Sequence, residues 1–175
     1  MSKVNKFLIV ANLAALFVYF GYTVFQKERL LEEGTLLLLK LAPVDPRSLM
    51  QGDYMALRYA FPFPDGTLPV RDDTLPRRGF CIVEPGHDGV AAIKRFQAAK
   101  EPLSPGEYLI AYTRPDYRIR IGAESFFFQE GTGSFYEKAE YGGLKVDSNG
   151  NSLLIGLFDD QKNRIVPVLP AQKSQ

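Results

Sequence analysis

The sequence has 175 residues, of which 46% are hydrophobic, and a formal net charge of +1 at pH 7. This balance provides no global field for binding nucleic acid or an acidic substrate, and without Trp any base stacking would depend on Tyr and Phe. The single cysteine, Cys81, excludes an intramolecular disulfide and a thiolate metal cluster, and the single histidine, His87, excludes a histidine-rich metal site. We therefore expect one domain with no cofactor, no metal and no nucleic-acid partner.

The first element is an uncharged apolar run over residues 7–25, in which Asn12 and Thr23 are the polar side chains. A helix of this length reaches roughly 28 Å, close to the ~30 Å hydrocarbon core of a bilayer. Lys3 and Lys6 precede the run, so the positive-inside rule places the N-terminus in the cytoplasm. We expect an uncleaved signal anchor that sends the rest of the chain across the membrane.

A cleaved signal peptide is the alternative to this anchor. Its apolar region is usually about 7 to 15 residues long and ends in small residues at the cleavage site. Here the alanines lie inside the run, and Gly21-Tyr22-Thr23 is a poor cleavage site. We expect an anchor helix over residues 1–33 that ends at Gly34 as its C′ residue. A β-rich domain over 34–166 and a flexible tail over 167–175 follow.

After Gly34 the pattern changes from helical to extended. Short apolar or alternating runs, separated by Gly and Pro, predict strands at 35–41, 54–60, 79–83, 90–97, 107–113, 117–121 and 125–129. Two closing strands, 144–147 and 151–158, flank the hairpin signal Asn149-Gly150. A capping box from Ser134 to Glu137, with Gly142-Gly143 as a stop, predicts one short helix. The fold class is therefore mainly β, or α+β at most: a transmembrane helix and a mostly antiparallel β domain with one short helix.

The most highly specified segment leads into the second predicted strand. It reads Asp45-Pro46-Arg47-Ser48 and, three residues later, Gly52-Asp53-Tyr54-Met55-Ala56-Leu57-Arg58-Tyr59. Pro46 suits a turn, Gly52 can adopt positive φ, and Arg47 could pair with Asp53. The segment is either a corner that feeds a strand or a surface that contacts a ligand or partner. The candidate positions are Asp45, Arg47, Ser48, Gly52, Asp53, Tyr54, Leu57 and Tyr59.

The chain resembles the GDYXXLXY family of bacterial membrane-anchored proteins. The motif that gives the family its name is present in full as Gly52-Asp53-Tyr54, Leu57 and Tyr59. The resemblance extends over the apolar N-terminal segment, Asp45-Pro46-Arg47-Ser48, and the block from Phe127 through Asp147. It implies a location in the bacterial envelope, and it supplies no catalytic residues. With the N-terminus in the cytoplasm, we expect the bacterial inner (cytoplasmic) membrane with the β domain in the periplasm.

A second likeness would make the protein an enzyme. The segment Ser48-Leu49-Met50-Gln51-Gly52-Asp53 is similar to part of the nucleophile box of signal peptidase I, and Ile93-Lys94-Arg95-Phe96, with Pro105-Gly106-Glu107, is similar to its Lys-Arg box. However, Val44 stands where that family has its nucleophilic serine, and the segment between the halves of the second box is longer. A Ser–Lys dyad would need Ser48 as a displaced nucleophile and Lys94 as its base.

Two further patterns concern the surface of the domain. Arg118 and Arg120 share one face of the predicted strand 117–121, which could meet anionic headgroups or a partner, although a solvated outer face explains them more simply. The run Phe126-Phe127-Phe128 must send a ring to each face of its strand. It predicts burial on both sides, or else an exposed aromatic at an interface. We expect burial.

These observations contain no complete catalytic set. The leading hypothesis is a non-catalytic, single-pass envelope protein whose β domain binds another membrane protein. The corner at 45–59 and the proline-rich loop predicted at 61–76 would form or brace that contact. The alternatives are a membrane-anchored Ser/Lys hydrolase that uses Ser48 and Lys94, and a domain that binds a lipid or cell-wall ligand in an apolar or basic pocket.

Overall fold

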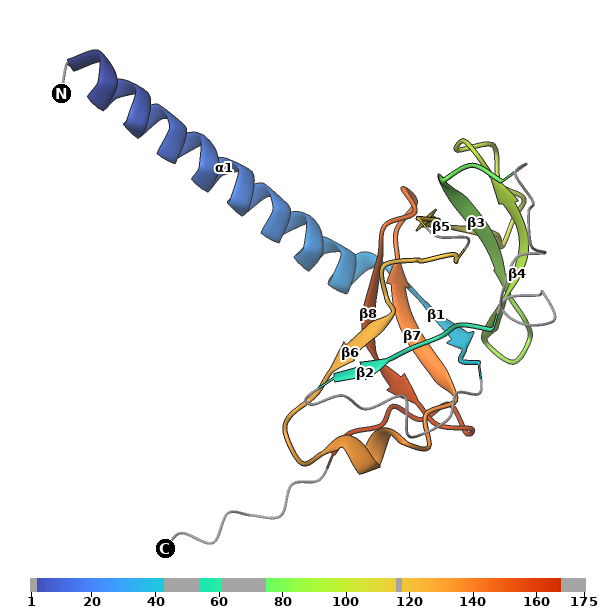
Figure 1. The fold of residues 1–175 in the computed structure, drawn as a ribbon. Helices are drawn as coiled ribbons and strands as arrows, with labels where there is room; N and C mark the ends of the chain where they lie inside the picture. Colours follow the sequence, from blue (N-terminus) through green and yellow to red (C-terminus); the bar gives the residue numbers. More distant parts are fainter. Residues whose placement is uncertain (1–2, 43–53, 61–74, 116–117, 168–175) are drawn as a thin grey trace, which may run out of the picture.

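The computed structural model describes residues 3–42, 54–60, 75–115 and 118–167. One long helix, α1 (Lys3–Glu33), precedes a β domain (Figure 1). The strands are β1 (Thr35–Lys40), β2 (Tyr54–Ala56), β3 (Arg78–Pro85), β4 (Val90–Gln97), β5 (Tyr108–Thr113), β6 (Ser125–Phe127), β7 (Tyr141–Val146) and β8 (Ser152–Phe158), and the 3-10 helix η1 (Gly133–Tyr136) precedes β7. The predicted fold class, an apolar N-terminal helix followed by a mostly antiparallel β domain, is confirmed.

The apolar surface of α1 is not covered by the rest of the described chain. Leu30, near the end of the helix, is its one buried residue. The most apolar stretch is long enough to cross a membrane, and none of it is buried. A core helix of a soluble domain would instead bury its apolar side against that domain. The length, composition and exposure of α1 therefore suggest a membrane anchor.

A short joint connects α1 to the sheet. Gly34 is the single residue between α1 and β1, and its N–H donates a hydrogen bond of 3.0 Å to the Leu30 carbonyl. Lys145 of β7 donates from Nζ to the Gly34 carbonyl at 2.7 Å. The helix ends at Glu33, directly before the predicted C′ residue Gly34, whose φ is not positive. Glycine is required for a different reason, because a Cβ at this position would lie 2.4 Å from the Leu30 oxygen.

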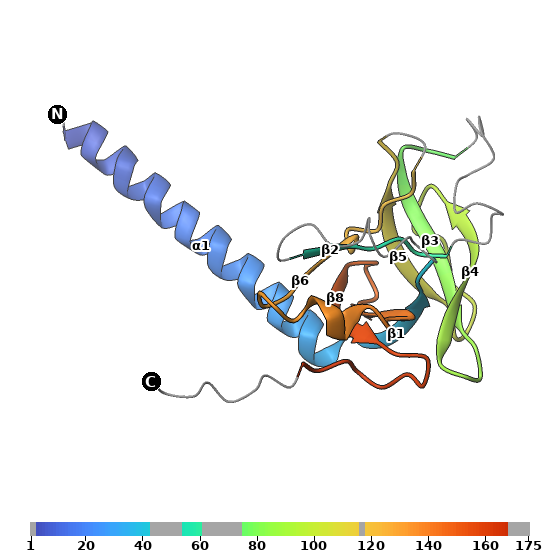
Figure 2. The ribbon, with the colours of Figure 1, turned by 60° about the horizontal axis from the view of Figure 1, so that its bottom comes forward.

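Six strands form one curved sheet in the order β5-β3-β4-β1-β7-β8. Its neighbouring strands are antiparallel except for β1 and β4, which are parallel. The sheet curls into a half-barrel, and Ala111 of the edge strand β5 donates its N–H to the Gly150 carbonyl in the β7–β8 turn at 2.8 Å. Strands β2 and β6 form a separate two-stranded sheet, which lies alongside β7 and β8 and does not extend the larger sheet (Figures 1 and 2).

Two apolar clusters fill the domain. The larger cluster lies inside the half-barrel and comprises Leu37, Leu39, Tyr59, Cys81, Val83, Ala91, Ile110, Tyr112, Ile119, Ile121, Ala123, Leu144 and Val146. The smaller cluster connects the small sheet to β8 and comprises Met55, Leu57, Tyr136, Leu157 and Ile165. Alternation along the strands explains the larger cluster, because Leu37 and Leu39 of β1 point to the same side.

The predicted strand at 117–121 is wrong. In the described part of this segment, pairing is limited to an isolated bridge between Arg120 and Thr113. The alternation that motivated the prediction is real, since Ile119 and Ile121 are buried while Arg118 and Arg120 are exposed. Alternation therefore reports which side chains are buried here and does not report a continuous ladder of hydrogen bonds.

The predicted short helix is present, but its capping box and its stop are wrong. The segment forms only η1, whose N-cap is Thr132 and has no side-chain capping bond. The Thr132 hydroxyl instead donates to the Gln129 carbonyl at 2.6 Å. Gly142 and Gly143 do not stop a helix but lie within β7. By contrast, the hairpin predicted at Asn149-Gly150 is confirmed, with Gly150 at φ +85° between β7 and β8.

Candidate functional site

The described half of the motif lies largely in the core. Leu57 belongs to the smaller cluster and Tyr59 to the larger one, and each is 4% exposed. The Tyr59 hydroxyl donates a hydrogen bond to the Ala123 carbonyl at 2.8 Å. Burial raises the pKa of this phenol well above its ordinary range, and the Glu124 carboxylate adds to the shift. A phenol held in this way does not ionise near neutral pH, so Tyr59 is a structural residue.

Backbone bonds fix the same segment between two parts of the fold. Tyr59 forms an isolated antiparallel bridge with Leu41, just after β1. The Leu57 N–H donates to the Glu124 carbonyl, which precedes β6, at 2.8 Å. The predicted strand at 54–60 therefore consists of the short β2 and an extension that connects β1 to the segment before β6.

The remaining candidate positions are not part of the described chain. They are Asp45, Arg47, Ser48, Gly52 and Asp53, and residues 61–74 of the proline-rich segment are likewise outside it. The proposed ion pair between Arg47 and Asp53 stays a prediction. Tyr54, which follows these residues directly, is the first position of the motif for which contacts are described.

Lys94 does not lie in the environment that a catalytic lysine needs. Its ammonium pairs with Glu84 across β3 and β4 at 2.8 Å, and its side chain is 50% exposed. The bond to Glu84 raises the pKa of Lys94, whereas a lysine that acts as a general base requires a pKa lowered by burial. The adjacent Arg95 pairs with Glu107. The residues that resemble a Lys-Arg box therefore form two surface ion pairs.

An aromatic pair, one ring half-buried and one exposed, occupies the outer face of the small sheet. Tyr54 of β2 and Phe127 of β6 are opposite each other in the register, and their ring centroids are 5.7 Å apart. Phe127 is 73% exposed, whereas Phe126 and Phe128 pack against Tyr136. Burial of all three phenylalanines, which the sequence predicts, is wrong because alternation sends the middle ring to solvent. We call Tyr54 and Phe127 the aromatic patch.

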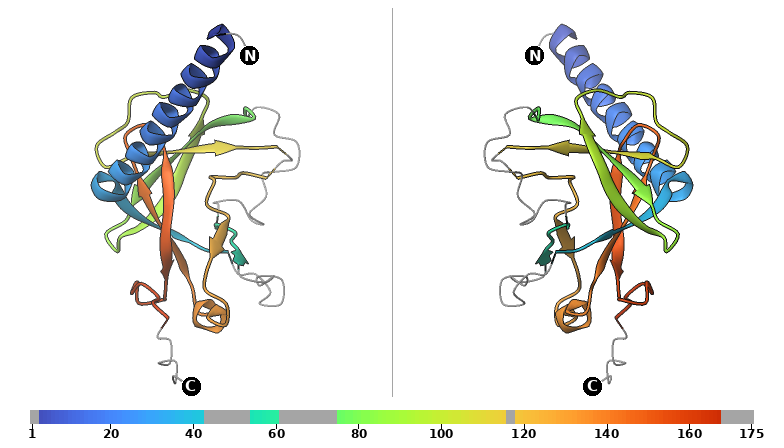
Figure 3. Two further views of the ribbon diagram at one scale, coloured as in Figure 1. Left: turned by 90° about the vertical axis from the view of Figure 1, so that its left-hand side faces the viewer. Right: turned by 90° about the vertical axis from the view of Figure 1, so that its right-hand side faces the viewer.

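The aromatic patch and the anchor are on different sides of the domain. Figure 3 shows β2 and β6 on one side of β7 and β8, and the end of α1 on the other. The smaller cluster lies beneath the patch, so β2 and β6 are supported from within by Met55 and Phe126. A partner on the patch would therefore meet a supported surface away from the helix.

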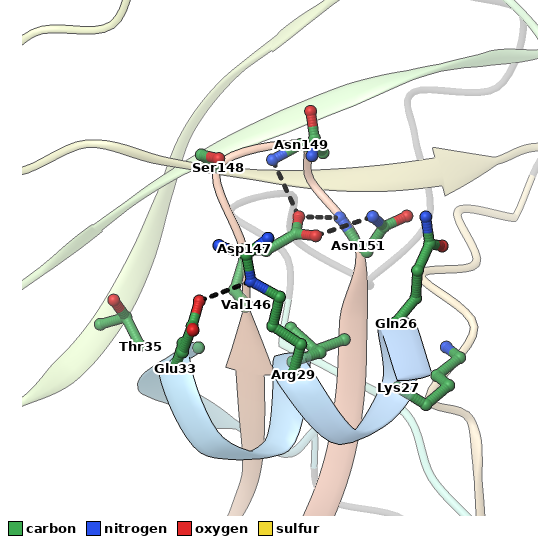
Figure 4. Close-up of a pocket in the computed structure, with 12 residues that line it drawn as sticks. Gln26, Lys27, Arg29, Glu33, Thr35, Val146, Asp147, Ser148, Asn149 and Asn151 are labelled. Atoms are coloured by element: carbon green, nitrogen blue, oxygen red, sulfur yellow. Dashed lines mark hydrogen bonds and ion pairs between the residues drawn. The ribbon is translucent and has the colours of Figure 1, made fainter. Parts of the chain in front are cut away.

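A pocket of about 460 Å³ lies between the end of α1 and the β7–β8 turn (Figure 4). It is lined by Gln26, Lys27, Arg29, Leu30, Glu33, Gly34, Thr35, Val146, Asp147, Ser148, Asn149 and Asn151. We call it the junction pocket. Arg29 pairs with Glu33 on its helix side at 2.7 Å. On its hairpin side, Asp147 accepts hydrogen bonds from Asn149 and Asn151 at 2.8–2.9 Å.

Neither feature supplies a metal centre or a nucleophile. Among residues 3–42, 54–60, 75–115 and 118–167, no group of three or more His, Cys, Asp or Glu side chains is placed to hold a metal ion. The Cys81 thiol is 1% exposed, and burial raises its pKa to about 12. Cys81 is therefore a core residue.

The GDYXXLXY protein family matches residues 16–157, from within α1 to β8. The chain belongs to the GDYXXLXY family. No curated protein and no solved structure matches it. In this GDYXXLXY protein, Leu57 and Tyr59 of the motif belong to the two clusters, while the half-buried Tyr54 contributes to the aromatic patch.

Sequence reasoning missed the junction pocket and the exposure of Phe127. Both walls of the pocket are recognisable as local elements, namely the end of a helix and a hairpin at Asn149-Gly150. Nothing in the sequence indicates that they meet, because their contact depends on the pairing of β1 with β7, which places Thr35 opposite Val146. For Phe127 a signal was available: side chains alternate between the two faces of a strand, so the middle ring of the Phe run faces away from the other two.

Proposed function

We propose that this GDYXXLXY protein is a membrane-tethered, non-catalytic binding subunit that docks onto another membrane protein through the aromatic patch. The observation that carries this proposal is the exposure of Phe127, the last residue of β6, which is 73% accessible. Residues 45–53, which hold the other candidate positions, precede Tyr54 directly in the sequence. The helix supports the tethering, and the lack of a suitable environment at Lys94 argues against hydrolysis.

Phe127 is not needed for the core. Phe126 and Phe128 already pack against Tyr136 from the same strand region, so the domain is filled without the middle ring. Complete burial of a phenylalanine side chain stabilises a contact by about 1.5–3 kcal/mol. Aromatic side chains are enriched at protein interfaces for this reason. The tilted Tyr54 and Phe127 pair therefore has the composition of an interface centre.

The joint at Gly34 favours a partner that is itself in the membrane. One residue separates α1 from β1, and the Lys145 bond holds the end of the helix against β7. The patch would consequently stay at a nearly constant height above the bilayer. Tethering both partners raises their effective concentration, so a small patch is sufficient for association. Lys3 and Lys6 favour an inner-membrane orientation with the domain in the periplasm.

Site-specific photocrosslinking in the native membrane tests the proposal. A benzophenone amino acid replaces Phe127 in the full chain, and the same amino acid at Ala92 serves as the control. Ala92 is also an exposed strand position but lies on β4, away from the patch. We expect a discrete adduct with one membrane protein from position 127 alone, and we expect Tyr54→Ser to reduce its yield.

Two outcomes would overturn the proposal. The first is that position 127 gives no adduct although the chain is folded and inserted. The second is that positions 127 and 92 give the same set of adducts, since random encounters in the membrane would do this. Folding of the substituted chains is checked by their thermal transition, which should be unaffected because both positions are exposed.

A further inference from the structure

We infer that the junction pocket binds the headgroup of an anionic phospholipid, with the phosphate at Arg29 and the polyol part at the β7–β8 turn. The inference takes α1 as the membrane span and is independent of the aromatic patch. It gives the pocket a ligand class that follows from its depth, its charges and its neutral hydrogen-bonding groups.

The depth of the pocket corresponds to the headgroup layer. The apolar run ends at Phe25, and the pocket begins at Gln26 and continues to Thr35. At ~1.5 Å per residue, the helical part from Gln26 to Glu33 covers roughly the first 12 Å beyond the hydrocarbon core. The headgroup layer of one leaflet is roughly 5–8 Å thick. The helix side of the pocket therefore begins among the headgroups.

The helix side of the pocket offers donors for a phosphate. Figure 4 shows the Arg29 side chain pointing from the helix toward the hairpin. Its bond to Glu33 uses only Nε, and a guanidinium carries four further N–H donors in a planar fork. That fork matches the geometry of a phosphate diester. Lys27 also lines the pocket and adds a second positive charge.

The hairpin side of the pocket offers neutral hydrogen-bonding groups. Ser148, Asn149 and Asn151 line it, while both carboxylate oxygens of Asp147 are already bound within the turn. The other carboxylate that lines the pocket, Glu33, is paired with Arg29. Hydroxyl and amide groups fit a hydroxylated headgroup such as glycerol, because each can donate or accept. We therefore expect the pocket to prefer headgroups that carry both a negatively charged phosphate and hydroxyl groups.

The turn is held in place before any ligand arrives. Its Gly150 carbonyl accepts the Ala111 N–H at 2.8 Å, and the Asn149 side chain accepts a bond from Lys100 at 3.1 Å. Asp147 adds three bonds from within the turn. A preorganised wall reduces the entropy lost on binding. A headgroup held between this wall and α1 would brace the domain against the bilayer.

Nuclear magnetic resonance of the full chain in bicelles tests the inference. Phosphatidylcholine bicelles are supplemented stepwise with phosphatidylglycerol, and the amide signals of residues 148–151 are followed. We expect saturable shifts at these amides. Arg29→Gln should weaken the apparent affinity about fivefold, the effect of one basic residue at a membrane surface. Arg29→Lys should recover part of it, and Lys138→Gln, which removes an exposed charge elsewhere, should not change it.

The same titration contains the results that would overturn the inference. These are shifts that never saturate, no shift at residues 148–151, or an equal effect of Lys138→Gln and Arg29→Gln. Inorganic phosphate added to pure phosphatidylcholine bicelles distinguishes the source of the anion. Identical shifts with inorganic phosphate would identify a site for free anions and would exclude the lipid. The Arg29 side chain is 65% exposed, so its replacement should preserve the fold, which the Ala111 amide signal reports.

Discussion

The hydroxyl of Tyr59 donates a 2.8 Å hydrogen bond to the backbone carbonyl of Ala123, 64 positions further along the chain. This bond ties the last residue of the family motif to the segment that precedes β6. Together with the bridge from Tyr59 to Leu41, it holds three distant segments around the larger cluster. The end of the motif is therefore explained by folding, and Tyr54 is the described motif residue that belongs to neither cluster.

Replacing Tyr59 by Phe tests this structural role. The ring is kept, so no cavity forms, but the buried Ala123 carbonyl loses its donor. We expect the free energy of unfolding to fall by about 1–3 kcal/mol. Urea unfolding of the full chain in detergent measures it. The control is Tyr141→Phe, at a half-buried tyrosine in β7. Equal losses in the two variants would contradict the assignment.

Gly143 should not tolerate a methyl group. A Cβ at this position would lie 2.2 Å from Cε2 of Phe158, which is itself 8% exposed. The ring would have to move in a packed core, so Gly143→Ala should destabilise the domain by about 1–3 kcal/mol. Thermal unfolding checks this. Gly21→Ala is the matched control because nothing lies within 4 Å of a Cβ there. A neutral Gly143→Ala would show that β7 and β8 are not packed as described.

The sequence located most of the strands correctly, but it did not reveal why particular positions must be glycine. Alternation and turn signals located Val90–Gln97 and the hairpin at Asn149-Gly150, because these are properties of neighbouring residues. Gly34 and Gly143 were interpreted from helix-ending preferences. Their actual role is to leave room for the Leu30 carbonyl and the Phe158 ring, which would clash with a Cβ. The contact with the Phe158 ring exists only in the folded domain. Local sequence patterns therefore locate secondary-structure elements, but they do not identify which surfaces of those elements pack together.

The same limit applies to the candidate sites. The motif was conspicuous in the sequence, and its Leu57 and Tyr59 proved to be core residues. The junction pocket was invisible because α1 and the β7–β8 turn are far apart in the chain. Phe127 was ambiguous, since a strand with three consecutive aromatics leaves open whether its second face is covered. Only the placement of the small sheet beside β8 decides that question.

Glu107 should make the stability of the domain depend on pH. The bidentate bond to Arg95, helped by the Ser104 N–H, lowers the pKa of the Glu107 carboxyl to about 2. Because its pKa is lowered by folding, the ionised Glu107 stabilises the folded state fully above the unfolded pKa of ~4.5. This stabilisation is lost as the pH falls toward 2. Glu107→Gln should therefore be less stable than the wild type at pH 7, and the difference should shrink below pH 4.

Unfolding curves of the two proteins at pH 7 and pH 3 check this prediction. Arg95→Gln should have a similar effect at pH 7, and the double variant should lose less than the sum of the two single losses. Additive losses, or a difference between wild type and Glu107→Gln that is the same at both pH values, would show that the pair does not act as described.

Cys81 should react with a thiol reagent only when the domain unfolds. The thiol is 1% exposed, its Sγ lies 3.3 Å from the Ile110 carbonyl, and burial raises its pKa to about 12. We expect almost no reaction with a thiol reagent in the folded protein at pH 8, and complete reaction in urea. Ala92→Cys, which adds an exposed thiol on β4, should react at once. Equal reaction rates of the two thiols in the folded state would contradict the burial of Cys81.

The bond from Lys145 to the Gly34 carbonyl should control how rigidly the domain is held over the membrane. Lys145→Met keeps much of the side chain's volume but removes the donor at the helix end. Spin labels at Glu28 and Ala92, one on α1 and one on β4, would report the distance between anchor and domain in bicelles. We expect Lys145→Met to broaden that distance distribution, and Lys138→Met to leave it unchanged. An unchanged distribution in Lys145→Met would mean that Leu30 and Gly34 alone fix the joint. A broadened one should also lower the crosslinking yield at Phe127, because a patch that varies in height meets a membrane-embedded partner less often.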